Sequence, residues 1–272
     1  MAFFRKTAAL MAVISLAVAT SIAASAQQAK STLDVMLERG TLIAGVKNDY
    51  PPFGYIDENG DTVGFDIDIA KYIADHLGVE LDLRPVTSAN RIPMLSNETI
   101  DLIAASMTIT QERAEVVDFS VPYIVIGGKF LVHSDSDITG YKDLADKTVT
   151  FTQGTPWGTK LEEEQPAAKH LVFQDKPQAV LALLQGKADA YVDDAAPLAI
   201  FAQQHEGKLK VVGEASRPLP MGIAVRQNDS KWRRAIDLAL IAMWEDGTWE
   251  KLHRKHFGTD PEPGFIIYNW KL

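Results

Sequence analysis

The sequence contains no cysteine. This excludes a disulfide framework, a thiol nucleophile, a cysteine-ligated metal and a cysteine that could carry a lipid. Basic residues are also scarce relative to acidic ones, and the net charge of −9 argues against nucleic acid as a partner. A glycine-rich phosphate loop, a nucleophile elbow and a paired metal-binding histidine motif are missing as well. We therefore expect no cofactor, no metal and no catalytic residue.

A long apolar run occurs only at the N-terminus. Arg5 and Lys6 precede an uncharged stretch, 7–22, and Ala24-Ser25-Ala26 follows it as a small-x-small cleavage pattern. This arrangement predicts a secretory signal peptide over residues 1–26, because the apolar run is short for the alternative of a membrane anchor. Since no later cysteine could be lipidated, we expect a mature chain of net charge −11 in the periplasm.

Strand and helix patterns alternate along the mature chain. A largely parallel α/β sheet covered by helices is the architecture that such alternation favours. The expected strands span 41–46, 80–84, 100–105, 148–152, 171–173 and 190–192. The expected helices span 67–77, 177–185, 231–244 and 248–256, with another beginning near 110. Asp66 is expected to cap the N-terminus of the helix at 67–77.

Short motifs distributed over nearly the whole mature chain carry a family resemblance. They are PPFGY at 51–55, GFDID at 64–68, NRIPML at 90–95, ASMTITQER at 105–113, DFSVPY at 118–123, QGT at 153–155, DD at 193–194 and DGTW at 246–249. In this order and spacing they resemble the extracellular solute-binding protein family for polar amino acids, the periplasmic component of ABC importers. The block from 105 to 123 is the most specific.

The resemblance implies an α/β, two-lobed periplasmic-binding-protein fold of type II, with two hinge crossings and the ligand in the cleft between the lobes. The first lobe would comprise residues 30–125 plus 220–272, and the second 126–219. The implied partners are a small amino acid and the membrane permease of an ABC importer, the chain itself being a monomer and not an enzyme.

The carboxylate of an amino acid must be paired when it leaves water. The resemblance assigns this role to Arg113, whose planar fork can donate two parallel hydrogen bonds. Thr108 would add its hydroxyl and backbone N–H, and Thr155 would add donors from the second lobe. Pro156 departs from the family pattern because proline lacks a backbone N–H. This predicts fewer hydrogen bonds from the second lobe to the ligand carboxylate.

The ammonium group of the ligand needs acceptors. The resemblance places Asp194 and the carbonyl of Ser106 there, with Asp193 as the rival that is expected to face the other way. Tyr50 matches the position where the family stacks an aromatic ring on its ligand.

The ligand side chain would meet residues that suit a distal carboxylate. The segment with Ser88 and Arg91 resembles the one that glutamate/aspartate binders use. Lys47 and Lys176 would bring up to two more cations without counter-charges, which favours glutamate or aspartate. Glutamine or another polar amino acid remains the alternative, because glutamine binders also carry this arginine and most lysines are solvated.

Two other functions are compatible with this fold. Some relatives are cyclohexadienyl-dehydratase-like enzymes with a catalytic acid before the second hinge strand, but residues 217–222 carry no carboxylate here. A sensory role at a membrane receptor stays open, since it uses the same liganded shape.

Overall fold

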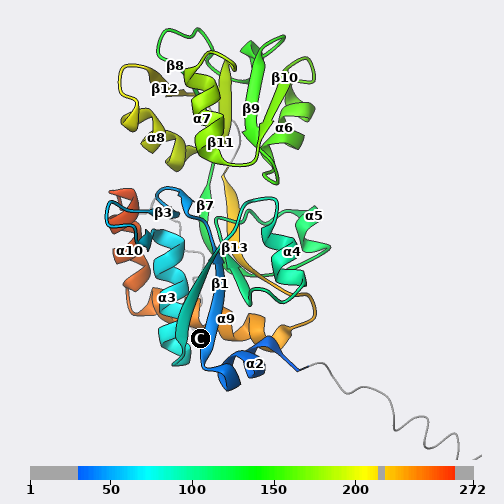
Figure 1. The fold of residues 1–272 in the computed structure, drawn as a ribbon, viewed down its shortest axis with the longest axis vertical. Helices are drawn as coiled ribbons and strands as arrows, with labels where there is room; N and C mark the ends of the chain where they lie inside the picture. The colour runs from blue at the N-terminus through cyan, green and yellow to red at the C-terminus, as the bar shows by residue number, and fades with distance from the viewer. Residues whose placement is uncertain (1–29, 214–217, 261–272) are drawn as a thin grey trace, which may run out of the picture.

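The computed structural model describes residues 30–213 and 218–260, so the predicted signal peptide lies outside the described residues. Two five-stranded sheets form two lobes, one above the other in Figure 1. The two-lobed α/β architecture expected from the sequence is confirmed. The exact lobe boundaries, 30–125 plus 220–272 and 126–219, stay a prediction.

The first lobe is built on a sheet with strand order β5-β1-β6-β13-β7. Its strands are β1 (Thr41–Val46), β5 (Glu80–Pro85), β6 (Leu102–Ala104), β7 (Asp118–Ile126) and β13 (Leu219–Val225). The accompanying helices are α2 (Thr32–Arg39), α3 (Phe65–Leu77), α4 (Arg91–Ser96), α5 (Gln111–Ala114), α9 (Ser230–Glu245) and α10 (Thr248–Phe257). A small sheet of β2 (Asp49–Tyr50), β3 (Gly54–Ile56) and β4 (Thr62–Val63) follows β1.

The second lobe is built on a sheet with strand order β10-β9-β11-β8-β12. Its strands are β8 (Gly128–His133), β9 (Thr148–Thr152), β10 (Lys169–Phe173), β11 (Ala190–Asp194) and β12 (Leu209–Val212). Its helices are the short η1 (Tyr141–Asp143), α6 (Trp157–Glu164), α7 (Lys176–Leu184) and α8 (Ala195–Gln204).

Each sheet is mixed, which corrects the expectation of largely parallel sheets. Strand β1 pairs in parallel with β5 and β6, but β13 runs antiparallel to β6 and β7. In the second lobe β9 is parallel to β10 and β11, while β8 is antiparallel to β11 and β12. The chain passes from the first lobe to the second along β7 and returns along β13, so these two strands run in opposite directions through the hinge.

Strands β7 and β13 form that hinge and run side by side between the lobes (Figure 1). Their register pairs Leu219 with Ile126 and Met221 with Ile124, next to the two crossings expected from the sequence. The loop after β6 is attached to the same place, because Thr108 forms an isolated bridge with Met221. A residue on this loop therefore keeps a fixed position relative to the hinge.

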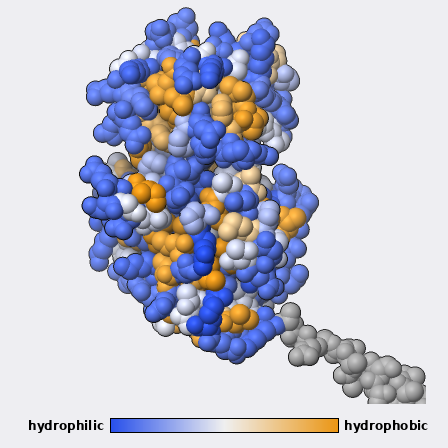
Figure 2. Space-filling model, viewed as in Figure 1, coloured by the Kyte–Doolittle hydropathy of each residue, from blue (hydrophilic) through white to orange (hydrophobic). Residues whose placement is uncertain are grey.

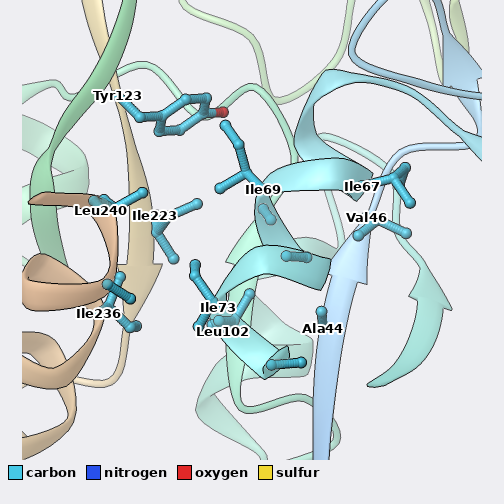
Figure 3. Close-up of a cluster of buried hydrophobic side chains, with 14 of the residues drawn as sticks. Ala44, Val46, Ile67, Ile69, Ile73, Leu102, Tyr123, Ile223, Ile236 and Leu240 are labelled. Carbon is cyan, nitrogen blue, oxygen red and sulfur yellow. The ribbon is translucent and has the colours of Figure 1, made fainter. Parts of the chain in front are cut away.

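Apolar side chains pack on the faces of the first sheet. Figure 3 shows Ile69 and Ile73 of α3 facing Leu102 of β6 and Ile223 of β13, with Leu240 of α9 beyond. All five side chains are fully buried. Burying a large aliphatic side chain contributes about 1.5–3 kcal/mol, so this cluster holds α3 and α9 firmly on the sheet.

Polar residues dominate the face of the molecule that Figure 2 shows. On the face in Figure 2, hydrophilic residues cover the rims of both lobes and hydrophobic residues gather in smaller patches between them. Across 30–213 and 218–260, none of the helices combines the length and apolar character that a membrane crossing requires.

A glycine at the start of β8 allows a tryptophan of α6 to pack against it. A Cβ on Gly128 would lie 2.2 Å from the ring of Trp157, which is only 1% exposed. We expect Gly128→Ala to lower the free energy of unfolding by about 1–3 kcal/mol through overpacking, measured by chemical denaturation.

Gly140→Ala is the matched control in the same lobe, because its Cβ would meet nothing within 4 Å. It should leave stability unchanged or slightly raised. Equal unfolding free energies for Gly128→Ala and the parent would contradict this packing.

Candidate functional site

A pocket between the lobes brings together most of the residues that the sequence singles out. Its walls are formed by Tyr50, Ser88, Arg91, Ser106 and Thr108 from the first lobe, and by Thr155, Pro156, Trp157, Lys176 and Asp194 from the second. Two predicted residues, Lys47 and Arg113, do not line this pocket but are buried close to it. Segments more than a hundred residues apart thus supply one small polar site.

Arg113 joins the two lobes. It lies on the single-turn helix α5, which begins where the side chain of Thr110 accepts from the N–H of Arg113. Its Nη1 donates to the carbonyl of Thr108 at 2.7 Å, and its Nη2 donates across the cleft to the carbonyl of Gly154 at 2.8 Å. Burial lowers the pKa of Arg113, while the charge of Asp194 opposes this. The guanidinium donates to carbonyl oxygens of both lobes.

Arg91 is the second guanidinium at the cleft. Its Nη1 donates to the carbonyl of Ala105 at 2.6 Å, whereas its buried Nε has no hydrogen-bond partner within the described part of the chain. Burial, followed by repulsion from Arg113, lowers the pKa of Arg91 to about 9, so it remains protonated at neutral pH. An arginine with unused donor capacity beside a pocket is suited to bind an anionic or carbonyl group.

The turn at 153–155 contacts the first lobe closely. Gly154 has φ +78°, and a Cβ there would lie 2.5 Å from the carbonyl oxygen of Ser88. Both donors of Thr155 point back into their own turn: the N–H and the hydroxyl donate to the carbonyl of Thr152 at 3.3 and 2.6 Å. In this arrangement the turn uses both donors, and the expected contact of Thr155 with a ligand stays a prediction.

Two adjacent aspartates end strand β11 at the pocket. Asp193 accepts from Trp157 Nε1 at 3.1 Å, from the N–H of Asp194 at 2.9 Å and from Lys176 Nζ at 2.6 Å. Tyr50 Oη lies 2.8 Å from Asp193 and 2.6 Å from Asp194. The expectation that Asp193 faces away is wrong, since both carboxylates reach the same tyrosine.

Asp194 retains the greater capacity to accept a new donor. Asp193 has several donors, whereas Asp194 lines the pocket and is bonded through its side chain to Tyr50. Burial and, second, the charge of Asp193 raise the pKa of Asp194 to about 7. An incoming cation would favour the ionised form of Asp194.

The two lysines do not bring free positive charge. Lys176 Nζ is paired with Asp193, and Lys47 Nζ lies 3.2 Å from Asp49 Oδ1. Burial lowers the pKa of Lys47 to about 8, against the opposing effect of Asp49. The expectation that both lysines lack counter-charges is thus wrong, because each has a nearby carboxylate that local sequence patterns did not reveal.

Asp66 is a site residue that sequence reasoning misassigned. Helix α3 is capped by the backbone of Gly64, and Asp66 is a fully buried residue inside the helix. Its carboxylate accepts from the N–H of Ser106 at 2.6 Å and from Tyr123 Oη at 2.7 Å. Ser106 has φ +45°, so Asp66 holds a backbone conformation that is unusual for serine. The available signal was the helical spacing, which places Asp66 on the same face as Ile69 and Ile73.

The buried state of Asp66 predicts a pH dependence of stability. Burial raises the pKa of Asp66 to about 7, against about 3.9 in the unfolded chain. The folded state therefore binds more protons between pH 4 and 7, and Asp66 lowers stability progressively as pH rises through that range. Relative to the parent, Asp66→Asn should gain up to about 4 kcal/mol in unfolding free energy from pH 4 to 7.

Urea denaturation at each pH measures this difference. Asp75→Asn, at an exposed position on the same helix, controls for the loss of one carboxylate. A constant difference between Asp66→Asn and the parent from pH 4 to 7 would contradict the assignment.

Several known binding proteins are similar to this chain over most of its length. The chain is 30% identical to the L-cystine-binding protein TcyJ of Escherichia coli, covering 93% of this chain and 96% of the relative. It is 36% identical to the ABC transporter glutamine-binding protein GlnH of Bacillus subtilis, covering 88% and 89%. Among solved structures, an ancestral amino acid-binding protein that is a precursor of cyclohexadienyl dehydratase matches with a TM-score of 0.79 and 37% identity, covering 84% of this chain and all of that one. The family profile of bacterial extracellular solute-binding proteins, family 3, matches residues 42–259, and the chain belongs to this family.

Proposed function

We propose that this protein captures one amino acid with an acidic side chain between its lobes and delivers it to the permease of an ABC importer. As a member of its family it is a solute-binding protein for polar amino acids. The observation that carries the proposal is a pair of opposite charges from opposite lobes: Asp194 of the second lobe lines the pocket, and Arg113 of the first lobe is buried beside it and reaches across to Gly154. No catalytic step is part of the proposal.

Two contacts across the cleft correspond to the two charged groups of an amino acid. Arg113 donates to a carbonyl oxygen of the second lobe, at Gly154, and Asp194 binds a hydroxyl of the first lobe, at Tyr50. In the proposed complex the ligand carboxylate takes the place of the carbonyl and the ligand ammonium takes the place of the hydroxyl. Thr108 and Ser106 lie on the loop that is bridged to hinge strand β13. They would therefore help to position the carboxylate and the ammonium group of the ligand.

Binding would favour the closed arrangement of the lobes. Hinge closure around a ligand is the general behaviour of periplasmic binding proteins. A ligand shifts such an equilibrium only through contacts that differ between the two states. An amino acid held by Arg113 of one lobe and Asp194 of the other makes its full set of contacts only when the cleft is closed.

The charge balance of the site supports an acidic side chain on the ligand. The residues in and beside the pocket include four cations and four carboxylates. The cations are Lys47, Arg91, Arg113 and Lys176, and the carboxylates are Asp49, Asp66, Asp193 and Asp194. The pKa of Asp66 and of Asp194 is raised to about 7, whereas the pKa values of Lys47 and Arg91 stay above 7. Lys47 and Lys176 each have a carboxylate nearby, whereas the buried Nε of Arg91 has no hydrogen-bond partner in the described residues, so a ligand carboxylate near Arg91 and Ser88 would supply the missing acceptor and opposite charge.

A neutral polar amino acid is the second candidate. The pairing of Lys47 with Asp49 and of Lys176 with Asp193 leaves Arg91 as the main cation for a ligand side chain. An amide oxygen could accept from Arg91 as well, and the relatives named above bind glutamine and cystine.

Substitution of Arg91 separates these two ligands. Arg91→Gln should weaken glutamate or aspartate binding by roughly 30-fold or more, the effect of removing one partner of a buried charge pair, and weaken glutamine much less. Calorimetric titration of both proteins with both ligands gives the four affinities required. Arg84→Gln, at an exposed arginine paired with Asp82, is the control for the loss of one positive charge.

A parent protein that prefers glutamine would refute the acidic ligand. Equal weakening of glutamate and glutamine by Arg91→Gln would refute it as well, and only the broader assignment to polar amino acids would then remain.

A further inference from the structure

The ammonium group of Lys176 has surroundings that are typical of a bound cation. Lys176 is the first residue of α7 in the second lobe, and it is only 2% exposed. Its Nζ donates to Asp193 Oδ2 at 2.6 Å and lies 4.0 Å from the centroid of the Tyr50 ring. A carboxylate on one side and an aromatic face on another are the groups with which proteins recognise organic cations.

The partner carboxylate is fixed in place. Asp193 is 1% exposed and accepts from Trp157 Nε1, from the hydroxyl of Tyr191 and from the N–H of Asp194. Among its hydrogen-bond donors in the described part of the chain, Lys176 is the one that carries a full charge. Without Lys176, Asp193 would be a buried anion bonded to neutral donors, which is an unfavourable state.

The same lysine borders the ligand pocket. Lys176, Tyr50 and Asp194 all line it. Asp193 and Asp194 both contact Tyr50 Oη, so their carboxylates are separated by no more than the reach of one amino-acid side chain. A ligand whose α-ammonium binds Asp194 could therefore extend a cationic tail to Asp193, were that position not already occupied.

We propose that Lys176 is the built-in occupant of a cation subsite formed by Asp193 and the ring of Tyr50, and that it excludes amino acids with cationic side chains. This inference rests on the proposed capture of an amino acid in the pocket. In the parent protein a lysine or arginine tail meets the ammonium of Lys176 and is repelled. When Lys176 is replaced by an uncharged residue, the subsite becomes available to an ammonium or guanidinium group supplied by the ligand.

Calorimetric titration with lysine, arginine, glutamate and glutamine tests this exclusion. The proteins are the parent, Lys176→Ala, Lys176→Arg and the double variant Lys176→Ala/Asp193→Asn. Lys176→Ala vacates the position and should bind lysine or arginine about tenfold or more tightly than the parent does, the gain expected from one charge-assisted contact in a desolvated site. Lys176→Arg keeps the positive charge and should keep the exclusion, and the double variant should lose the gain because its subsite is neutral.

A second measurement covers the case in which Lys176→Ala folds poorly without a cation in the subsite. Added butylammonium should then raise the melting temperature of Lys176→Ala and not that of the parent, because the ion fills the position that the lysine occupied. No rise for Lys176→Ala beyond that of the parent would count against the subsite.

The outcomes separate this inference from the proposed function. If the parent binds none of the amino acids, the proposed function fails. If the parent binds an amino acid but Lys176→Ala binds lysine and arginine no more tightly than the parent, only the cation subsite is refuted. An equal gain in the single and double variants also refutes it, since Asp193 would then play no part.

Discussion

The cost of burying charge between the two lobes is the constraint on which the rest of this structure depends. Arg91, Arg113, Lys176 and the paired aspartates of β11 are all largely removed from water. Such groups are tolerated only when each finds an opposite charge or hydrogen-bond partners. Here Arg113 and Asp194 each have one partner in the opposite lobe, Gly154 and Tyr50, and these two contacts would be lost if the cleft opened.

The fold places these charges accurately because their supports are rigid. The loop that carries Ser106 and Thr108 is attached on one side to the hinge strand β13 and on the other to Asp66 of helix α3. The aspartates end a fully buried strand, and Lys176 begins a helix capped by the side chain of Asp175. These contacts fix each half of the site within its own lobe, and β7 and β13 are the strands that connect the two halves.

Local sequence patterns predicted the elements and many of the pocket residues. Strands 41–46 and 148–152 were predicted at the bounds that the structure shows, because apolar and β-branched runs mark buried strands regardless of the rest of the fold. The family resemblance, through the motifs that contain them, also led to the prediction that Arg91 and Asp194 lie at one site, and both line the pocket.

The partners of buried charges could not be predicted in this way. The pairing of Lys176 with Asp193 and the contact of Asp66 with Ser106 join residues that no periodicity relates. Asp66 was taken for a helix cap because an aspartate at a helix start usually has that role. Its true partner lies 40 residues away on another element, and only the packing of α3 against the sheet brings the two together.

The central claim is that Arg113 and Asp194, from opposite lobes, bind the two charged groups of a single amino acid. Its most direct test compares the amino acid that binds the parent most tightly with two analogues, one lacking the α-ammonium and one lacking the α-carboxylate, by calorimetry. Each deletion leaves one buried charge of the site without a partner, so both analogues should bind roughly 30-fold or more weakly. An analogue that binds as tightly as the intact amino acid would contradict the claim.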